Sequence, residues 1–274
     1  TQTSSLGTDR TAVAISAGEG HTCAILDDGS VSCWGSNNGG RLGDGTTTDR
    51  NTPTPTSSLG TGRTAIAITV GEGLGSHTCA ILDDGSVSCW GYNTYGQLGD
   101  GTDTLRNTPT QTSSLGTDRT AVAISAGFRH TCAILDDGSV SCWGYNTYGQ
   151  LGDGTTTDHS TPTQTSTLGT DRTAIAITVG GDHTCAILDD GSVSCWGNNS
   201  QGRLGDGTTT DRLTPTQTSS LGEGRTAVAI TAGYGYTCAI LDDRSVSCWG
   251  WNIFGQLGDG TTNDRFTPTA IEIE

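Results

Sequence analysis

Five copies of one unit make up almost the whole chain of 274 residues. The segment HTCAILDDGSVSCWG, residues 21–35, returns with few changes at positions 77, 130, 183 and 236. Successive copies lie 53 residues apart, except that a three-residue insertion at 74–76 separates the first two further. A period of this length restricts the chain to an architecture in which each unit packs on its neighbours. The sequence leaves no room for a separate globular domain.

Each unit predicts four β-strands. In the first copy, residues 12–18 (AVAISAG) alternate with the period of two that is typical of a strand. The segments HTCAIL and SVSCW then flank an Asp-Asp-Gly turn at 27–29, which predicts a hairpin with Cys23 opposite Cys33. A connection rich in Gly and Asn follows, and after it a Thr-Pro-Thr segment that suits an outer edge strand.

Four short antiparallel strands per unit predict an all-β fold, a β-propeller of five four-stranded blades. Each unit also carries the pattern His-Thr, two apolar strands about an Asp-Gly turn, Trp-Gly, Asn and a segment such as Gly96-Gln97-Leu98-Gly99. This pattern resembles the repeat of the regulator of chromosome condensation family, in a bacterial-like, disulfide-containing form. The resemblance covers essentially the whole chain and implies a propeller, although most propellers of that family have seven blades. It transfers the fold and not the family's guanine-nucleotide exchange activity, because the sequence carries no wedge-like insertion or basic tail.

The predicted domain is a single propeller over 1–274. Its blades are expected at approximately 11–56, 64–112, 120–165, 173–218 and 226–274, with 1–6 as a surplus outer-strand segment. Residues 1–6 and 269–274 occupy the same phase of the repeat and compete for one outer strand. Because Ile-Glu-Ile-Glu alternates cleanly, the C-terminal segment is expected to complete the fifth blade. The alanines of the inner strands, such as Ala12 and Ala14, predict a narrow, crowded axis.

Ten cysteines form five pairs of identical spacing. The pairs are Cys23/Cys33, Cys79/Cys89, Cys132/Cys142, Cys185/Cys195 and Cys238/Cys248. The hairpin register favours five disulfides, each stabilising the fold by about 2 to 3 kcal/mol. Small buried thiols are an alternative. Zinc held by His21 and its neighbouring cysteines is a third interpretation, disfavoured because the fifth copy has Tyr236 in that place. The histidines are instead expected to pack at strand starts and to bond to backbone.

The Asp-Asp turns lie at the same point of every copy and form an acidic set on one face. Calcium is conceivable there, but the carboxylates lack the density of a calcium loop. Asp in such a turn usually bonds its own backbone, so no metal site is assigned. In the fifth copy Arg244 replaces the glycine of the turn. A left-handed conformation would be strained there, and this turn is expected to change type.

The copies differ mainly in two loops, one after the first strand and one after Trp-Gly. The strand directions place both loops on one face, opposite the acidic turns. Aromatic side chains on loops are typical of recognition surfaces, and packing of the rings between blades is the alternative. The ligand-binding candidates are Tyr92, Tyr95, Phe128, Arg129, Tyr145, Tyr148, Tyr234, Trp251 and Phe254.

Composition excludes several classes of function. The net charge of −16, from 29 acidic against 13 basic residues, repels phosphate backbones, so nucleic acid is not an expected partner. No apolar run is long enough for insertion into a membrane. The sequence contains no nucleophile elbow, phosphate loop or metalloprotease helix, and we expect neither an enzyme nor a cofactor.

Together these features predict a non-enzymatic scaffold for recognition or adhesion, which binds protein or glycan through its variable loop face. Regular cysteine pairs favour an oxidising compartment, so the expected location is extracellular or the cell surface. The alternative is a structural subunit of a self-assembling extracellular polymer or oligomer. Assembly would then proceed by exchange of terminal strands through Thr1–Leu6 and Ala270–Glu274.

Overall fold

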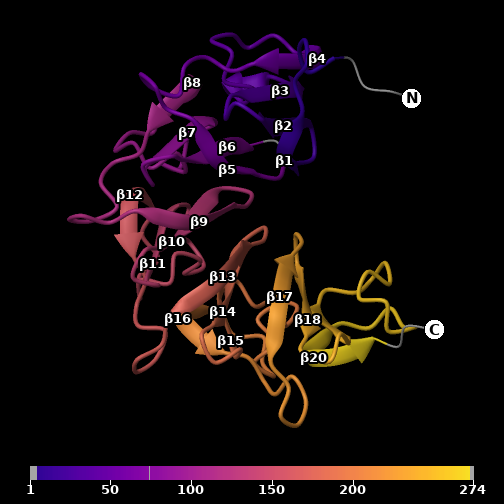
Figure 1. Ribbon diagram of the computed structural model, residues 1–274. Coiled ribbons are helices and arrows are strands. Elements are labelled where there is room, and N and C mark those ends of the chain that lie inside the picture. The colour runs from indigo at the N-terminus through magenta and orange to yellow at the C-terminus, as the bar shows by residue number, and fades with distance from the viewer. Residues whose placement is uncertain (1–4, 74, 272–274) are drawn as a thin grey trace.

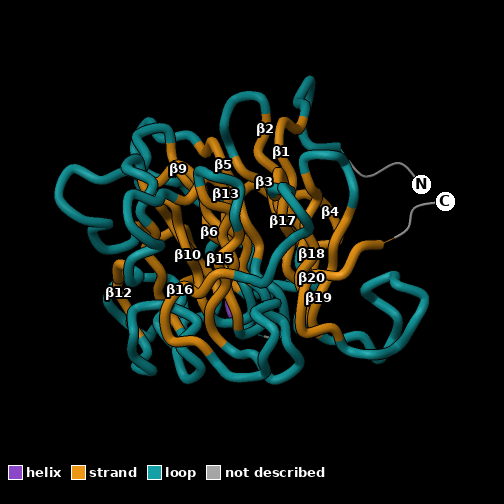
Figure 2. Tube along the Cα trace, turned by 90° about the horizontal axis from the view of Figure 1, so that it is seen from below, coloured by secondary structure: helices purple, strands orange, loops and turns teal. Residues whose placement is uncertain are grey.

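A computed structural model describes residues 5–73 and 75–271 as five four-stranded antiparallel sheets. Each sheet is one blade, and its strands lie side by side in chain order. The blades stand around an arc, with the first strand of each blade toward the inside (Figure 1). Figure 2, turned by 90°, shows the strands as a middle layer with loops at both ends. The predicted fold class, an all-β propeller of five four-stranded blades, is confirmed.

The strands have nearly the same bounds in every repeat. The first blade comprises β1 (Ala12–Ala17), β2 (His21–Leu26), β3 (Val31–Gly35) and β4 (Arg50–Pro55). The second comprises β5 (Ala65–Val70), β6 (His77–Leu82), β7 (Val87–Gly91) and β8 (Arg106–Gln111). The third comprises β9 (Ala121–Ala126), β10 (His130–Leu135), β11 (Val140–Gly144) and β12 (His159–Gln164). The fourth comprises β13 (Ala174–Val179), β14 (His183–Leu188), β15 (Val193–Gly197) and β16 (Arg212–Gln217). The fifth comprises β17 (Ala227–Ala232), β18 (Tyr236–Leu241), β19 (Val246–Gly250) and β20 (Arg265–Ile271).

The hairpin register follows the sequence pattern. Cys23 lies opposite Cys33, and Ile25 lies opposite Val31. Gly29 takes the left-handed conformation that the turn needs, with φ of 76°, and its N–H donates to the carbonyl of Leu26.

All ten cysteines are paired within their own hairpins, with the Cα atoms of each pair 4.1 Å apart. The bridges are Cys23–Cys33, Cys79–Cys89, Cys132–Cys142, Cys185–Cys195 and Cys238–Cys248. The alternative of small buried thiols is wrong, because the described chain holds no free cysteine. Cys142 packs in the same buried cluster as Trp196, and Cys195 packs in that of Trp249. Both cysteines have no exposed surface, so the predicted disulfides at these positions lie in the core.

The C-terminal segment supplies the outer strand of the fifth blade, as the sequence predicts. In β20, Ala270 lies opposite Ser247 and Ile271 lies opposite Val246. The segments assigned to strand exchange fall partly on residues 1–4 and 272–274, which lie outside the described residues. Self-association through Thr1–Leu6 and Ala270–Glu274 therefore stays a prediction.

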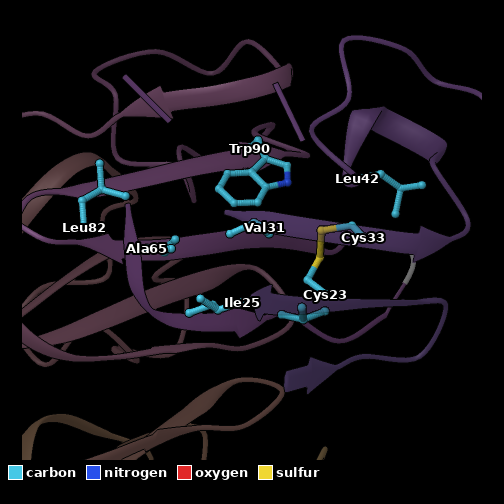
Figure 3. Close-up of a cluster of buried hydrophobic side chains, with 10 residues drawn as sticks. Cys23, Ile25, Val31, Cys33, Leu42, Ala65, Leu82 and Trp90 are labelled. Carbon is cyan, nitrogen blue, oxygen red and sulfur yellow. A yellow bond between two sulfur atoms is a disulfide. The ribbon is translucent and has the colours of Figure 1, made fainter. Parts of the chain in front are cut away.

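The hydrophobic core is divided into clusters between neighbouring blades. In the cluster of Figure 3, Ile25 and Val31 of the first blade pack against Leu82 and Trp90 of the second, beside the disulfide of Cys23. Trp90 is fully buried there. The same cluster recurs at the next three junctions, around Trp143, Trp196 and Trp249. A blade therefore buries its apolar faces only when it has a neighbour on each side.

The two ends of the arc keep one such face open. Ile240 in the last blade is 45% exposed, whereas its counterpart Ile187 in the fourth is fully buried. At the other end Trp34, on the first blade, is partly exposed while the other four repeat tryptophans are fully buried. Over the described residues the helical structure is the three-residue turn η1 (Asn38–Gly40), which is far too short to cross a membrane.

The expectation of a crowded axis is wrong. Ala65 and Ala121 begin inner strands but are buried against neighbouring blades. The branched residue that follows each of them, Ile66 or Val122, is at least 60% exposed. Alanine is needed where two blades approach closely, so the alternation leaves the larger residue on the open side of the strand.

Each of the first four blades is also bonded to the next through a buried histidine. The Nε2 atoms of His21, His77, His130 and His183 lie 2.6 to 2.9 Å from the hydroxyl of a threonine in the following blade. That threonine donates its proton to a carbonyl, for example Thr131 to Gln97, so the histidine must donate from Nε2. The expected bonding of these histidines to backbone is therefore wrong. The zinc alternative loses its ligands, because the cysteines beside the histidines are in disulfides.

Arg244 does not change the type of its turn. It has a φ of 73°, and its N–H donates to the carbonyl of Leu241 as Gly29 does to Leu26. In the earlier repeats the turn must be glycine for a second reason, because a Cβ on Gly29 would lie 2.4 Å from Thr64 of the next blade. Among the described residues no sixth blade packs on the turn of Arg244, so only the backbone strain remains there.

Candidate recognition surface

Two loops of each blade lie beside each other on one face of the arc, as the strand directions predict. The N–H of Tyr145, after β11, donates to the carbonyl of Arg129 between β9 and β10 at 3.0 Å. The N–H of Trp251 donates in the same way to Gly235 at 2.9 Å. We call the surface formed by the loops between the first and second and between the third and fourth strands of each blade the variable face.

A buried asparagine holds the longer of these loops in place. In the third blade Asn146 is fully buried, and its side-chain oxygen accepts from the N–H of Leu151 at 2.9 Å. Its amide donates to Asp153, and its own N–H donates to Asp158. The same network is built around Asn37, Asn199 and Asn252. Asn93 keeps its bonds to Asp100 and Leu98, but Leu105 stands where the other repeats have the second aspartate. The loops are thus rigid supports for the side chains that vary.

Aromatic rings from separate blades form a continuous row on this face. The ring of Phe128 in the third blade lies 6.2 Å from Tyr234 in the fifth. Tyr234 lies 6.5 Å from Trp251, which lies 5.4 Å from Phe254. All three contacts are edge-to-face, the arrangement that aromatic quadrupoles favour.

Arg129 extends the row toward the second blade. Its guanidinium carbon is 4.7 Å from the ring centre of Phe128, 5.2 Å from Tyr95 and 5.5 Å from Tyr145. Tyr145 in turn contacts Tyr95 at 4.9 Å and Tyr148 at 6.3 Å. These cation–π contacts fix a positive charge among the rings. The structure therefore brings together every predicted ligand-binding candidate except Tyr92, which lies beside Arg41 at 5.6 Å.

The rings both pack against neighbouring blades and face solvent. Tyr234 is 55% exposed and Phe254 is 77% exposed, whereas the others are partly buried. Tyr92 rests on Gly39 of the preceding blade, where a Cβ would come within 2.6 Å of the ring. Interblade packing thus accounts for one side of the rings and leaves the other side available.

Two functional groups of this face were not among the sequence candidates. Arg203 is almost completely buried and lies next to Tyr234, to whose carbonyl Nη1 donates at 3.4 Å. The carboxyl of Asp182, partly buried nearby, has a raised pKa because burial outweighs the nearby charges of Arg203 and Arg129. The available signal was the alternation of Arg and Gln at one repeat position, where Arg203 corresponds to Gln150.

The acidic turns on the opposite face are occupied by internal contacts. Asp28 accepts from both the N–H and the hydroxyl of Ser30, which confirms the predicted bonding of Asp to its own turn. Its other oxygen pairs with Arg10, a partner that the sequence pattern did not indicate. In each of the other four turns, the equivalent aspartate pairs with the equivalent arginine of its own blade. Within the described residues, no group of three His, Cys, Asp or Glu side chains is arranged for a metal.

Comparison with known proteins adds the following. A family model described as RCC1-like domain matches residues 1–274. The ultraviolet-B receptor UVR8 of Arabidopsis thaliana is 33% identical over 94% of this chain and 57% of its own length. The human ubiquitin ligase HERC2 is 30% identical over 95% of this chain, but over only 5% of its own length. The chain thus spans little more than half of the first of these relatives.

Two solved structures share the fold. Human WBSCR16 superposes with a TM-score of 0.84 at 20% identity, covering 96% of this chain and 68% of that one. Prp20p of Saccharomyces cerevisiae, studied for its binding to Gsp1p and histones, gives a TM-score of 0.59 at 17% identity over 96% of this chain and 77% of its own. At these identities the likeness concerns the fold alone.

Proposed function

The chain belongs to the RCC1-like domain family, and on that premise we propose that it is a non-enzymatic recognition scaffold whose variable face binds a protein or a glycan. The observation that carries the proposal is the row of aromatic rings around Arg129. Rings with one side packed and one side open provide large contact area at small entropic cost. A fixed arginine among them adds a directional charge, the combination typical of binding hot spots.

The location of the differences among repeats supports the same site. The five units agree in their core, hairpins and loop networks, and they diverge where the variable face meets solvent. In the family, the yeast relative Prp20p is described by its binding to other proteins, and this makes a binding role a natural use of the fold. The acidic turns do not support a catalytic role, because their aspartates form the same ion pairs with arginine in each blade.

The five disulfides support an extracellular or cell-surface location. Each closes a hairpin, and eight of the ten cysteines have no exposed surface. Disulfides of this number persist in oxidising compartments. A secreted or surface-exposed scaffold of this kind would act in recognition or adhesion, outside the reducing cytosol.

The proposal is tested by truncating the rings and measuring ligand retention. The disulfide-intact chain is screened against a glycan array and a display library of random peptides, and retained ligands are measured again with variants. The alanine variants are made at Tyr92, Tyr95, Tyr145, Tyr148, Trp251 and Phe254. We expect them to lose retention with nearly unchanged thermal unfolding, while Asp189→Asn on the opposite face retains the ligand. Loss of the fold in these variants would assign the rings to the core, and full retention would reject the proposed surface.

A second candidate function is self-assembly as an extracellular structural subunit. The open end faces favour it, because Ile240 and Trp34 occupy positions that are buried at the internal junctions. Strand exchange through the termini is the proposed route. The mass of the chain in solution, without reductant, reports assembly, and deletion of residues 1–5 should dissolve it. Assembly unaltered by that deletion would reject the exchange of the N-terminal segment.

A further inference from the structure

A small cavity of about 310 Å³ opens on the variable face between the fourth and fifth blades. Tyr148, Tyr234 and Trp251 supply aromatic sides to it, and Asp182, Asn198 and Arg203 supply polar groups. The rings of Tyr234 and Trp251 are inclined to each other by 61°, so that they form a corner. Its volume lies at the lower limit of ligand sites, and it suits one small ring rather than a folded segment of protein.

Buried polar groups in this cavity have unused hydrogen-bonding capacity. Arg203 is 6% exposed; Nη2 donates to Ser200 at 3.2 Å and also to Gln201, but its buried Nε has no partner. Asp182 forms no side-chain hydrogen bond or ion pair with the rest of the described chain, and only the more distant charges of Arg203 and Arg129 act on it. A carboxylate that has no partner within the described chain and is partly exposed at the cavity favours a ligand that donates hydrogen bonds.

The charges of the cavity select against charged ligands. A carboxylate or phosphate would meet the negative charge of Asp182, and an ammonium would meet the guanidinium of Arg203. A neutral molecule with hydroxyls around its rim and an apolar C–H face meets both requirements. Its hydroxyls can donate to the carboxylate and accept from Arg203 and Asn198, and its C–H face can lie on an aromatic ring.

We propose that this cavity binds a single neutral pyranose ring, either a free sugar or the terminal residue of a glycan. The inference rests on the proposed recognition function and names its ligand class at one position of the variable face. The site occurs once in the five repeats, because no other repeat has an acidic residue at the position of Asp182, where Gly20 and Gly235 are counterparts. Arg203 corresponds to Arg41 in the first repeat and to glutamine, as in Gln97 and Gln150, in the others. These counterparts show which substitutions the fold accepts.

Saturation-transfer NMR on the disulfide-intact chain tests the proposal directly. The probes are the methyl glycosides of glucose, galactose, mannose and N-acetylglucosamine, with N-acetylneuraminic acid as the charged comparison. We expect at least one neutral glycoside to bind with a Kd of about 1 mM. Asp182→Gly and Arg203→Gln, which import residues from other repeats, should each weaken it by about tenfold. Asp189→Asn, in the same blade on the opposite face, should leave it unchanged.

Three results would overturn the proposal. They are the absence of binding by every neutral glycoside at about 10 mM, undiminished binding in both cavity variants, and binding of the acidic sugar in place of neutral ones. The proposed function fails separately. If a peptide retained by the chain is lost on truncating Tyr95 and Tyr145 while no neutral glycoside binds, the recognition surface stands and the sugar site falls. If glycosides bind as expected while ring truncation away from the cavity has no effect on any ligand, the broad surface falls and the cavity stands.

Discussion

His77 of the second blade donates a hydrogen bond from Nε2 to the hydroxyl of Thr131 in the third, at 2.6 Å, and both side chains are completely buried. The hydroxyl of Thr131 donates its own hydrogen bond to the carbonyl of Gln97, which belongs to the loop of the second blade. This relay of hydrogen bonds joins His77 and the Gln97 loop of the second blade to Thr131 of the third, in addition to the polypeptide connection. Its repetition at each internal junction makes it a structural signature of the arc.

Removing the hydroxyl from this relay should destabilise the junction. Thr131→Val preserves the shape of the side chain but leaves His77 with no partner for either ring nitrogen, since Nδ1 already has none. The expected loss is about 1 to 3 kcal/mol in the free energy of unfolding, measured by urea titration without reductant. Thr22→Val is the matched control, because within the described residues no histidine bonds to Thr22, and it should cost much less. Equal costs for the two variants would contradict the relay.

Stability should fall as the pH drops below about 6.5. Burial lowers the pKa of His21, His77 and His130 to about 3, and that of His183 well below 6.5. In the unfolded chain these histidines take up protons at the ordinary histidine pKa, whereas in the folded chain they stay neutral. Each histidine therefore lowers the free energy of unfolding by up to about 1.4 kcal/mol for each pH unit below that pKa. The carboxylates titrate in the unfolded chain mainly below pH 5, which leaves pH 6.5 to 5 as the diagnostic window.

The measurement for this window is the urea midpoint at pH 7, 6 and 5. His183→Gln should make the slope shallower by roughly one part in four, because one of four equivalent groups is removed. A flat stability profile between pH 7 and pH 5 would contradict neutral burial of the histidines.

Mild reduction should open the Cys238–Cys248 disulfide first. It lies on the open face of the last blade, where Cys238 is partly exposed, whereas eight cysteines of the other blades are completely buried. The rate of reduction depends on how easily the thiolate of the reductant reaches a disulfide sulfur. Loss of this bridge should lower the free energy of unfolding by about 2 to 3 kcal/mol. Alkylation followed by mass spectrometry gives the order. Earlier reduction of Cys132–Cys142 or Cys185–Cys195, in the interior blades, would show that exposure does not control it.

Arg244→Gly should stabilise the fold. A non-glycine residue at φ of 73° carries backbone strain, and its removal should yield about 1 kcal/mol in the thermal or urea unfolding of the chain. The reverse change, Gly29→Arg, should be far more damaging, because the new Cβ would lie 2.4 Å from Thr64. A loss of stability in Arg244→Gly would mean that the arginine side chain makes a contact worth more than the strain.

The sequence predicted most of the fold because its signals are local. The turn glycine and the alternation around Cys23 and Cys33 determine the hairpin register, and the repeat multiplies it five times. The features that the sequence did not predict correctly, the surroundings of the inner-strand alanines and the partners of the histidines, depend on contacts with the neighbouring blade. The alanines were assigned to the axis although they face an adjacent sheet, and the partner of His77 lies 54 residues away.

The same reason limits what could be predicted of the site. The ring of Phe128 contacts Tyr234 although an entire blade separates them in sequence. The variation among repeats indicated the aromatic residues, and the strand directions placed them on one face. Asp182 and Arg203 were not candidates because their importance comes from lining one cavity beside Tyr234 of the next blade, which variation among the repeats alone does not show.

The most direct test of the variable face is hydrogen–deuterium exchange of the chain with and without a retained ligand from the glycan array or peptide library. We predict that protection appears in the loops around Tyr95, Phe128, Tyr148 and Trp251 and that the Asp-Asp turns are unaffected. Protection confined to those turns, or to the end faces around Trp34 and Ile240, would contradict the assignment of recognition to the variable face.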